Sequence, residues 1–187
     1  MGVPIERGTT TQLLNRIGAG DLEAAHELAP MIYSELHDLA GALLARQPSA
    51  TLQPTGLVHE AWIRFAGEES SFENRFQFYA LASKIMRSVL VDHTRARQAQ
   101  KRGQGRQPVT WIDAGEDAPE PALDLLDLDD ALRRLEGLDG ELFRVVELRF
   151  FGGLSHGEIA RAFGVSLPTI ERRWRLARAW LHAELRP

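Results

Sequence analysis

Apolar residues recur along most of this chain at spacings of three and four positions, which is the period of an amphipathic helix. The alternation typical of β-strands is nearly absent, and the segment PVTWI at residues 108–112 is the exception. The pattern therefore predicts an all-α protein with two small helical domains joined by a flexible linker.

Capping residues and glycines predict where the N-terminal helices begin and end. A capping-box pattern at Thr9 begins a first helix, which stops at the sequence GAG, residues 18–20. Asp21 is expected to cap a second helix, and Pro30 to begin a longer third helix that runs to about Arg46. Further helices are expected at residues 54–66 and at about 75–98, with a polar loop at 67–74.

The composition changes between residues 100 and 121, where Gly, Gln, Pro and acidic residues replace apolar ones. Such a segment has little to bury and is predicted to be the linker. It divides the chain into an N-terminal domain of residues 1–99 and a C-terminal domain of residues 122–187.

Two caps and a glycine predict a helix-turn-helix in the C-terminal domain. Ser155 and Glu158 have the spacing of a capping box, and Gly164 suits the left-handed residue of a tight turn. Ser166 can cap the next helix, with Pro168 in its first turn. Two short helices joined in this way are typical of a DNA-binding unit whose second helix enters the major groove.

The second helix of this unit has one apolar side and one arginine-rich side. Helical spacing places Ile170, Trp174, Ala177 and Leu181 toward the core. Arginine can bond guanine or clamp phosphates, and glutamate can accept from cytosine, although a helix with solvated arginines is the alternative. The residues expected to contact DNA are Pro168, Thr169, Glu171, Arg172, Arg173, Arg175 and Arg178.

The net charge of −4 conceals a segregation of charge along the chain. Residues 84–106 contain seven basic residues and one acidic residue, whereas residues 113–141 contain eleven acidic and two basic residues. Such blocks favour contact with a polyanion at two places rather than along the whole length. The chain has no cysteine, no apolar run long enough for a membrane span and no apolar N-terminal signal segment, so a cytoplasmic protein is expected.

The long helix after residue 75 combines a core stripe with a basic face. Lys84, Arg87 and Arg95 fall within about 80° of one another, and such a face can follow DNA phosphates. Just before it, Phe72, Asn74 and Arg75 suit unpaired bases, which stack on rings and bond to amides. The alternative is that the rings of this segment belong to the core. Residues expected in the core are Phe78, Leu81, Ala82, Ile85 and Val89.

Together, LVHEAWIRF, FYALASKIMRSVLVDHTRAR and ELRFFGGLSHGEIARAFGVSLPTIERRWRLARAWL resemble the extracytoplasmic-function (ECF) sigma factors of bacterial RNA polymerase, in the sigma-70 class. The resemblance covers nearly the whole chain. It implies partners in core RNA polymerase, through its β′ clamp and β subunit, and in promoter DNA, with an anti-sigma factor as a further candidate.

The resemblance also assigns roles to segments of this chain. The helix at 57–66 would dock on the clamp helices, the loop at 67–75 would capture a flipped minus-10 base, and the following helix would hold the DNA. The C-terminal helix would contact the minus-35 element, and the acidic linker would thread toward the polymerase active centre. The polymerase-binding residues implied are Leu57, Val58, Glu60, Ala61, Trp62, Arg64 and Phe65.

One segment departs from the family pattern, in which an acidic stretch precedes the clamp-binding helix. Here the sequence is QPTG, residues 53–56, without an acid. We hypothesise that a Ser/Thr kinase phosphorylates Thr55, or Thr51 as second choice, which would add negative charge at a helix N-terminus. The alternative is that Thr55 is simply a capping hydroxyl or a first-turn residue, and that apolar packing of Trp62 and Phe65 suffices for docking.

Enzymatic and metal sites find no support in the sequence. HEAWI at residues 59–63 lacks the second histidine of a zinc motif, GQG at 103–105 lacks the rest of a dinucleotide loop, and no G-x-S-x-G occurs. No cofactor, metal or catalytic residue is therefore expected. Two other functions stay open, a stand-alone helix-turn-helix regulator with an N-terminal sensing domain and an interaction module that does not bind DNA.

Overall fold

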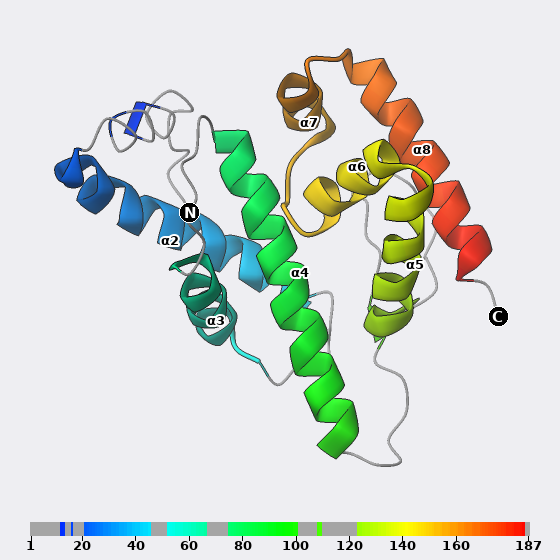
Figure 1. Ribbon diagram of the computed structural model, residues 1–187, viewed down its shortest axis with the longest axis horizontal. Coiled ribbons are helices and arrows are strands. Elements are labelled where there is room, and N and C mark those ends of the chain that lie inside the picture. Colours follow the sequence, from blue (N-terminus) through cyan, green and yellow to red (C-terminus); the bar gives the residue numbers. More distant parts are fainter. Residues whose placement is uncertain are drawn as a thin grey trace.

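The fold is all-α, as the hydrophobic pattern predicts (Figure 1). The structure is a computed structural model, and it describes residues 21–45, 52–66, 75–100, 108–109 and 123–185, together with Gln12, Leu13 and Arg16. Its helices are α2 (Leu22–Ala45), α3 (Pro54–Ala66), α4 (Arg75–Gln100), α5 (Leu125–Leu138), α6 (Gly140–Phe150), α7 (His156–Phe163) and α8 (Leu167–Glu184). In this part of the chain no helix is long and apolar enough to cross a membrane.

Helix α2 is continuous, so the predicted break at Pro30 is wrong. The predicted cap is present, because the Ala24 amide donates to Oδ1 of Asp21 over 3.2 Å. Proline removes one helical hydrogen bond, but buried Leu28 and Ile32 on either side hold both halves against the same core. The helix predicted from Thr9 to the GAG sequence lies largely outside the described residues.

The other predicted helices are found at or near their expected positions. Helix α3 has the predicted bounds, and α4 ends at Gln100, two residues beyond the predicted end. Of the core stripe predicted on α4, Phe78, Ala82, Ile85 and Val89 are buried and Leu81 is half-buried. Helix α3 packs against both α2 and α4.

The segment predicted as the linker lies mostly outside the described residues. Two of its residues form β1 (Pro108–Val109), which pairs antiparallel with β2 (Leu123–Asp124). These two-residue strands are the β-structure in the described part of the chain, and they bring the two ends of the 110–122 segment together. The division into two domains stays a prediction.

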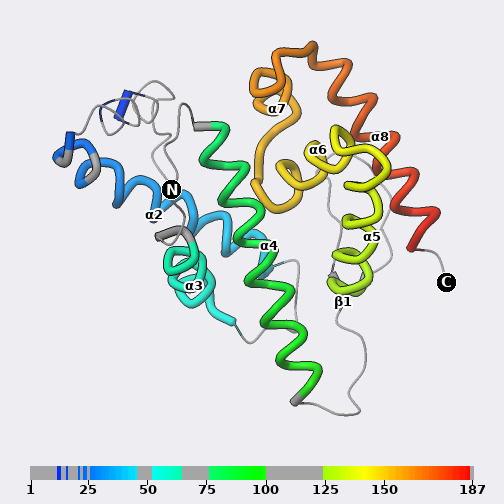
Figure 2. The backbone as a smooth tube through the Cα atoms, in the orientation of Figure 1, coloured from blue at the N-terminus to red at the C-terminus, as the bar shows by residue number. Residues whose placement is uncertain are grey.

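Helices α5–α8 pack together at one side of α4, while α2 and α3 lie at the other side (Figure 2). Helix α6 packs on α5 and α8, and α7 packs on α6 and α8. Helix α4 touches both α5 and α6, so it belongs to the packing of both halves of the chain. This contact determines which faces of α4 remain accessible.

Candidate nucleic-acid interface

Helices α7 and α8 are joined by a three-residue turn whose details confirm the predicted caps. Ser155 caps α7 and forms a reciprocal capping box with Glu158. Gly164 ends α7 in the left-handed conformation, with φ of 64°. Ser166 caps α8 through the Thr169 amide, and a proline lies in the first turn. The turn is therefore specified locally by polar caps and one glycine.

The buried side of α8 confirms the predicted apolar stripe. Ile170, Trp174, Ala177 and Leu181 are each at most 5% exposed. On the opposite side Pro168, Glu171, Arg172 and Arg175 are exposed. The exposed side presents two guanidinium groups and one carboxylate from adjacent helical turns, which is a surface able to bond base edges or phosphates.

Three predicted contact residues of α8 lie partly within the protein. Thr169 is half-buried and its hydroxyl is hydrogen-bonded with the Ser166 hydroxyl at 2.8 Å, so it belongs to the helix cap. Arg173 is half-buried and pairs with Glu141 of α6, while Arg178 is half-buried. The exposed arginine surface is therefore narrower than the sequence pattern alone indicates.

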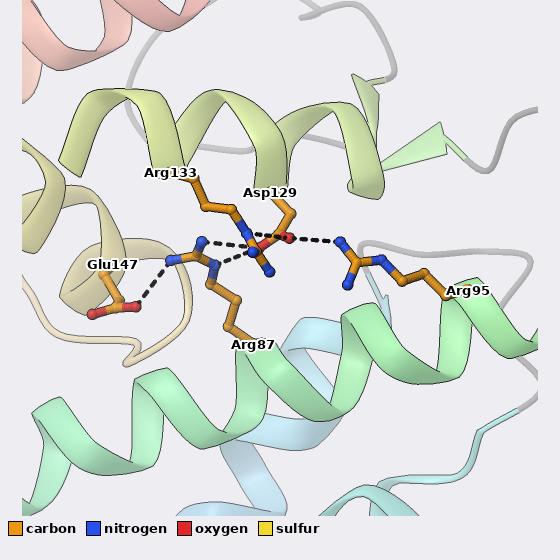
Figure 3. Close-up of polar contacts among 5 residues, drawn as sticks. All are labelled: Arg87, Arg95, Asp129, Arg133 and Glu147. Carbon is orange, nitrogen blue, oxygen red and sulfur yellow. Dashed lines mark hydrogen bonds and ion pairs between the residues drawn. The ribbon is translucent and has the colours of Figure 1, made fainter. Parts of the chain in front are cut away.

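On α4, the predicted basic face is divided between solvent and the interior. Lys84 is exposed, but Arg87 is only 8% exposed and lies against α5 and α6. Its Nε and Nη2 atoms each lie 2.9 Å from Oδ1 of Asp129, and its Nη1 lies 3.2 Å from Oε1 of Glu147 (Figure 3). The Arg87 guanidinium also lies over the Phe143 ring, 5.3 Å from its centroid. The expectation that Arg87 is exposed is thus wrong in this conformation.

Asp129 is shared by three arginines from two helices (Figure 3). Besides Arg87, Arg95 of α4 places Nη2 at 3.4 Å from Oδ2 of Asp129, and Arg133 of α5 places Nε at 3.1 Å from the same atom. Asp129 is 2% exposed, whereas the side chains of Arg95 and Arg133 are about half exposed. We call Arg87, Asp129 and Glu147 the interhelix ion cluster, because they join α4 to α5 and α6.

Glu147 is held in a mostly buried position within this cluster. Loss of water on burial raises the pKa of its carboxyl above the usual value, although the positive charges of Arg87 and Lys84 oppose this shift. Glu136 on α5 adds a smaller repulsion in the same direction as burial. The positive charges of Arg87 and Lys84 therefore offset only part of the cost of burying the Glu147 carboxylate.

The apolar residues of α3 that the resemblance assigns to polymerase binding separate into an inner and an outer part. Leu57, Val58 and Ala61 are at most 4% exposed, so in this structure they hold α3 in the core and are not accessible to a partner. Trp62 is 39% exposed, and Ile63, which was not predicted, is 73% exposed. Ile63 follows Ala61 by about 200° of helical rotation, which was the sequence signal for its outward position.

The polar residues of α3 have two different environments. Glu60 is exposed, whereas Arg64 donates to the Ser88 hydroxyl over 2.7 Å and pairs with Asp92 of α4 at 2.9 Å. The outer surface of α3 therefore offers an aromatic ring, an aliphatic side chain and one carboxylate.

Several predicted residues, or their side chains, lie outside the described part of the chain. Phe72 and Asn74 lie outside the described residues, as does Thr51. Arg75 begins α4 and Phe65 lies in α3, but their side chains are outside the described set. Thr55 is exposed in the first turn of α3, which contains no acidic residue.

Asp129 and Glu147 are the residues that sequence reasoning missed. They lie 42 and 60 positions from Arg87, and neither belongs to a short motif. Glu147 lies outside both charge blocks, but for Asp129 the signal was the succession of a basic and an acidic block. It was interpreted as contact with an external polyanion, although the two blocks also complement each other.

Comparison with known families gives a match over most of the chain. A family model described as "ECF sigma factor" matches residues 7–187. No curated protein matches the chain.

Proposed function

This chain belongs to the ECF sigma factor family, and on that premise we propose that it binds core RNA polymerase through α3 and directs it to promoters through α4 and α8. Membership in the family carries the general role, which is to direct transcription initiation by RNA polymerase at promoter DNA. The assignment of individual helices to individual contacts is the proposal.

The exposed side of α8 is the observation that carries the proposal. Its capped start and buried stripe fix the rotation of the helix, and that rotation turns Arg172 and Arg175 outward. Two arginines one turn apart can bond guanines or phosphates of the minus-35 element, and Glu171, which directly precedes Arg172, can accept from a cytosine. Lys84 on α4, with the preceding segment that contains Phe72 and Asn74, is assigned to the minus-10 element.

The exposed surface of α3 supports docking on the polymerase. Trp62 is 39% exposed and Ile63 is 73% exposed, and Glu60, one helical turn before Ile63, is exposed as well. Exposed aromatic and aliphatic groups next to a charge are typical of protein interfaces. The buried Leu57, Val58 and Ala61 contribute by holding this surface in position.

We further propose that phosphorylation of Thr55 strengthens docking, which makes a Ser/Thr kinase a candidate partner. Thr55 is exposed, and a phosphate there would supply the negative charge that the first turn of α3 lacks. Negative charge is favourable at a helix N-terminus. Thr51 is the second candidate.

The experiment that tests the function is run-off transcription with purified bacterial core polymerase and a library of promoter fragments. Both the unmodified chain and Thr55→Glu are used, so that a need for negative charge does not hide activity. We expect transcripts that depend on the chain and disappear in the double variant Arg172→Ala/Arg175→Ala. DNA binding that never depends on polymerase would instead indicate a stand-alone regulator, and absence of any salt-dependent DNA binding would indicate an interaction module.

A further inference from the structure

Helix α4 is held against α5 and α6 by a contact that uses charge as well as packing. Arg87 extends from α4 between two carboxylates, Asp129 of α5 and Glu147 of α6, and its guanidinium lies over Phe143 (Figure 3). The position over an aromatic ring and the approach of two nitrogen atoms to one carboxylate oxygen make this a well-defined site for a guanidinium. The contact therefore fixes Arg87 in one position.

A second close approach lies beside the interhelix ion cluster. Gly152, in the loop after α6, lies so near α4 that a Cβ atom there would overlap the Ser83 side chain. The next residue, Gly153, has φ of 66°, and a Cβ atom on it would lie 3.2 Å from Leu39 of α2. The loop after α6 thus fits closely against the N-terminal helices, in agreement with the packing of α4 on α6.

The contact is not sealed along its whole length. A cleft of about 850 Å³ runs between α4 and helices α5–α7, and it is lined by Lys84, Arg87, Asp129, Arg133 and Glu147 among others. Lys84 and Arg133 are exposed at its edges. The contact therefore encloses a cleft that is lined by charged as well as apolar side chains, and its two sides are not packed together along their whole length.

The groups around Asp129 are those that would bind a DNA phosphate. Three guanidiniums converge on one carboxylate, and the same planar donors bind phosphate and carboxylate oxygens with similar geometry. In this structure the carboxylate occupies the position that an external anion would need. Because Arg87 is 8% exposed, DNA cannot reach it while α5 and α6 remain in place.

We propose that Asp129 and Glu147 are internal substitutes for DNA phosphate, and that they hold the free chain closed with Arg87 masked. Opening exchanges one anionic partner of the α4 arginines, Arg87 and Arg95, for another, so bound DNA offsets the cost of breaking their ion pairs with α5 and α6. Core polymerase favours the open form if it binds α3 and the C-terminal helices at separate places. This inference rests on the proposed role of α4 in holding promoter DNA.

The test measures the opening and the DNA affinity separately. The chain contains no cysteine, so Ala96→Cys on α4 and Leu138→Cys on α5 can be spin-labelled without background, and both positions are exposed. Distances between the labels are measured by electron paramagnetic resonance in the full chain, with and without Asp129→Asn. Binding of a fluorescein-labelled duplex is measured without polymerase. Asp130→Asn is the matched control, because Asp130 is exposed on the same helix and the change in net charge is equal.

We expect one narrow distance distribution for the parent and for Asp130→Asn, and a broad, longer distribution for Asp129→Asn. DNA affinity should rise about tenfold in Asp129→Asn and change little in the control, since affinity scales with the fraction of open molecules. Glu147→Gln, which keeps the shape of the side chain, should give a smaller change in the same direction. It also serves as the test variant if Asp129→Asn does not fold.

Each contrary result has a distinct meaning. Unchanged distances in both variants would overturn the inference and leave the transcription result untouched. Longer distances without a gain in DNA affinity would overturn the masking of a DNA site, and would show the ion cluster to be structural only. If Asp129→Asn opens as predicted but the parent chain supports no transcription with core polymerase, the result counts against the proposed function and not against this inference.

Discussion

Arg87 of α4 and Asp129 of α5 meet across the contact between the two halves of the chain, with two nitrogen atoms of the guanidinium each 2.9 Å from one carboxylate oxygen. Both side chains are buried. Because an isolated buried charge is costly, each of the two residues depends on the other. Substitutions at this pair and at the exposed surfaces should therefore have separable consequences.

Arg172 and Arg175, the exposed arginines of α8, should each contribute separately to promoter affinity. We expect Arg172→Ala and Arg175→Ala each to weaken binding of the polymerase holoenzyme to its promoter by about 1–3 kcal/mol if the side chain contacts a base. Arg134→Ala, which removes an exposed arginine from α5, should change it much less. Equal effects of all three substitutions in a gel-shift titration would point to non-specific charge.

The outer surface of α3 should bind polymerase without supporting the fold. Ile63→Ser is expected to weaken binding to core polymerase while changing the unfolding free energy by no more than about 0.5 kcal/mol, as is usual for exposed positions. Leu138→Ser is the control, because Leu138 is 70% exposed on α5 and Ile63 is 73% exposed. Leu57→Ala should instead cost about 2–5 kcal/mol of stability. Unchanged polymerase binding by Ile63→Ser, measured by surface plasmon resonance, would contradict the assignment.

Charge at the start of α3 should govern docking if Thr55 is a phosphorylation site. Thr55→Glu is expected to bind core polymerase more tightly than the parent. Kinase treatment is expected to strengthen polymerase binding by the parent but not by Thr55→Ala. Gln53→Glu adds the same charge just before the helix and tests whether position matters. Tight binding by the unmodified chain, or full activity of Thr55→Ala in cells, would make the switch unnecessary.

The raised pKa of Glu147 gives stability a definite dependence on pH. Between the usual glutamate pKa and the higher value in the folded protein, the native state binds more protons than the unfolded state. The contribution of this group to the unfolding free energy therefore falls as pH rises through that interval. Glu147→Gln should flatten the dependence in urea titrations at a series of pH values, whereas Glu60→Gln on the exposed side of α3 should not. A difference between Glu147→Gln and the parent that is constant with pH would refute this.

Substitution by alanine should destabilise the protein for different reasons at Gly164 and at Gly152. Gly164→Ala meets no atom within 4 Å, so its cost arises from the backbone alone, about 1–2 kcal/mol for φ of 64°. Gly152→Ala places a Cβ atom 2.7 Å from the Leu148 carbonyl oxygen as well as against Ser83. The melting temperature should therefore fall further for Gly152→Ala, and the reverse order would indicate that the loop after α6 adapts easily.

The sequence predicted those parts of the fold that depend on local chemistry. The capping box at Ser155 and Glu158, the turn at Gly164 and the buried stripe of α8 all involve residues within a few positions of one another. Pro30 shows the limit of such rules, because tertiary burial on both sides of it overrides a local helix-breaking signal.

The environment of Arg87 could not be predicted in the same way. Helical periodicity correctly separated it from the core stripe of α4, yet a second set of helices covers the face on which it lies. Its partners come from positions whose spacing carries no motif. The complementary charge blocks pointed to Asp129, and Glu147 lies outside those blocks. The same reasoning located α8 and its arginines but did not reveal the pairing of Arg173 with Glu141.

The sharing of Asp129 among three arginines makes the contact unequally sensitive to mutation on its two sides. Loss of Arg95 or Arg133 leaves the Asp129 carboxylate with two cationic neighbours, so a substitution at either position should weaken the contact only a little. Loss of the single carboxylate removes a partner from all three at once. A random mutation is therefore expected to loosen the closed form far more when it falls in the codon of Asp129 than when it falls in the codon of Arg95 or Arg133.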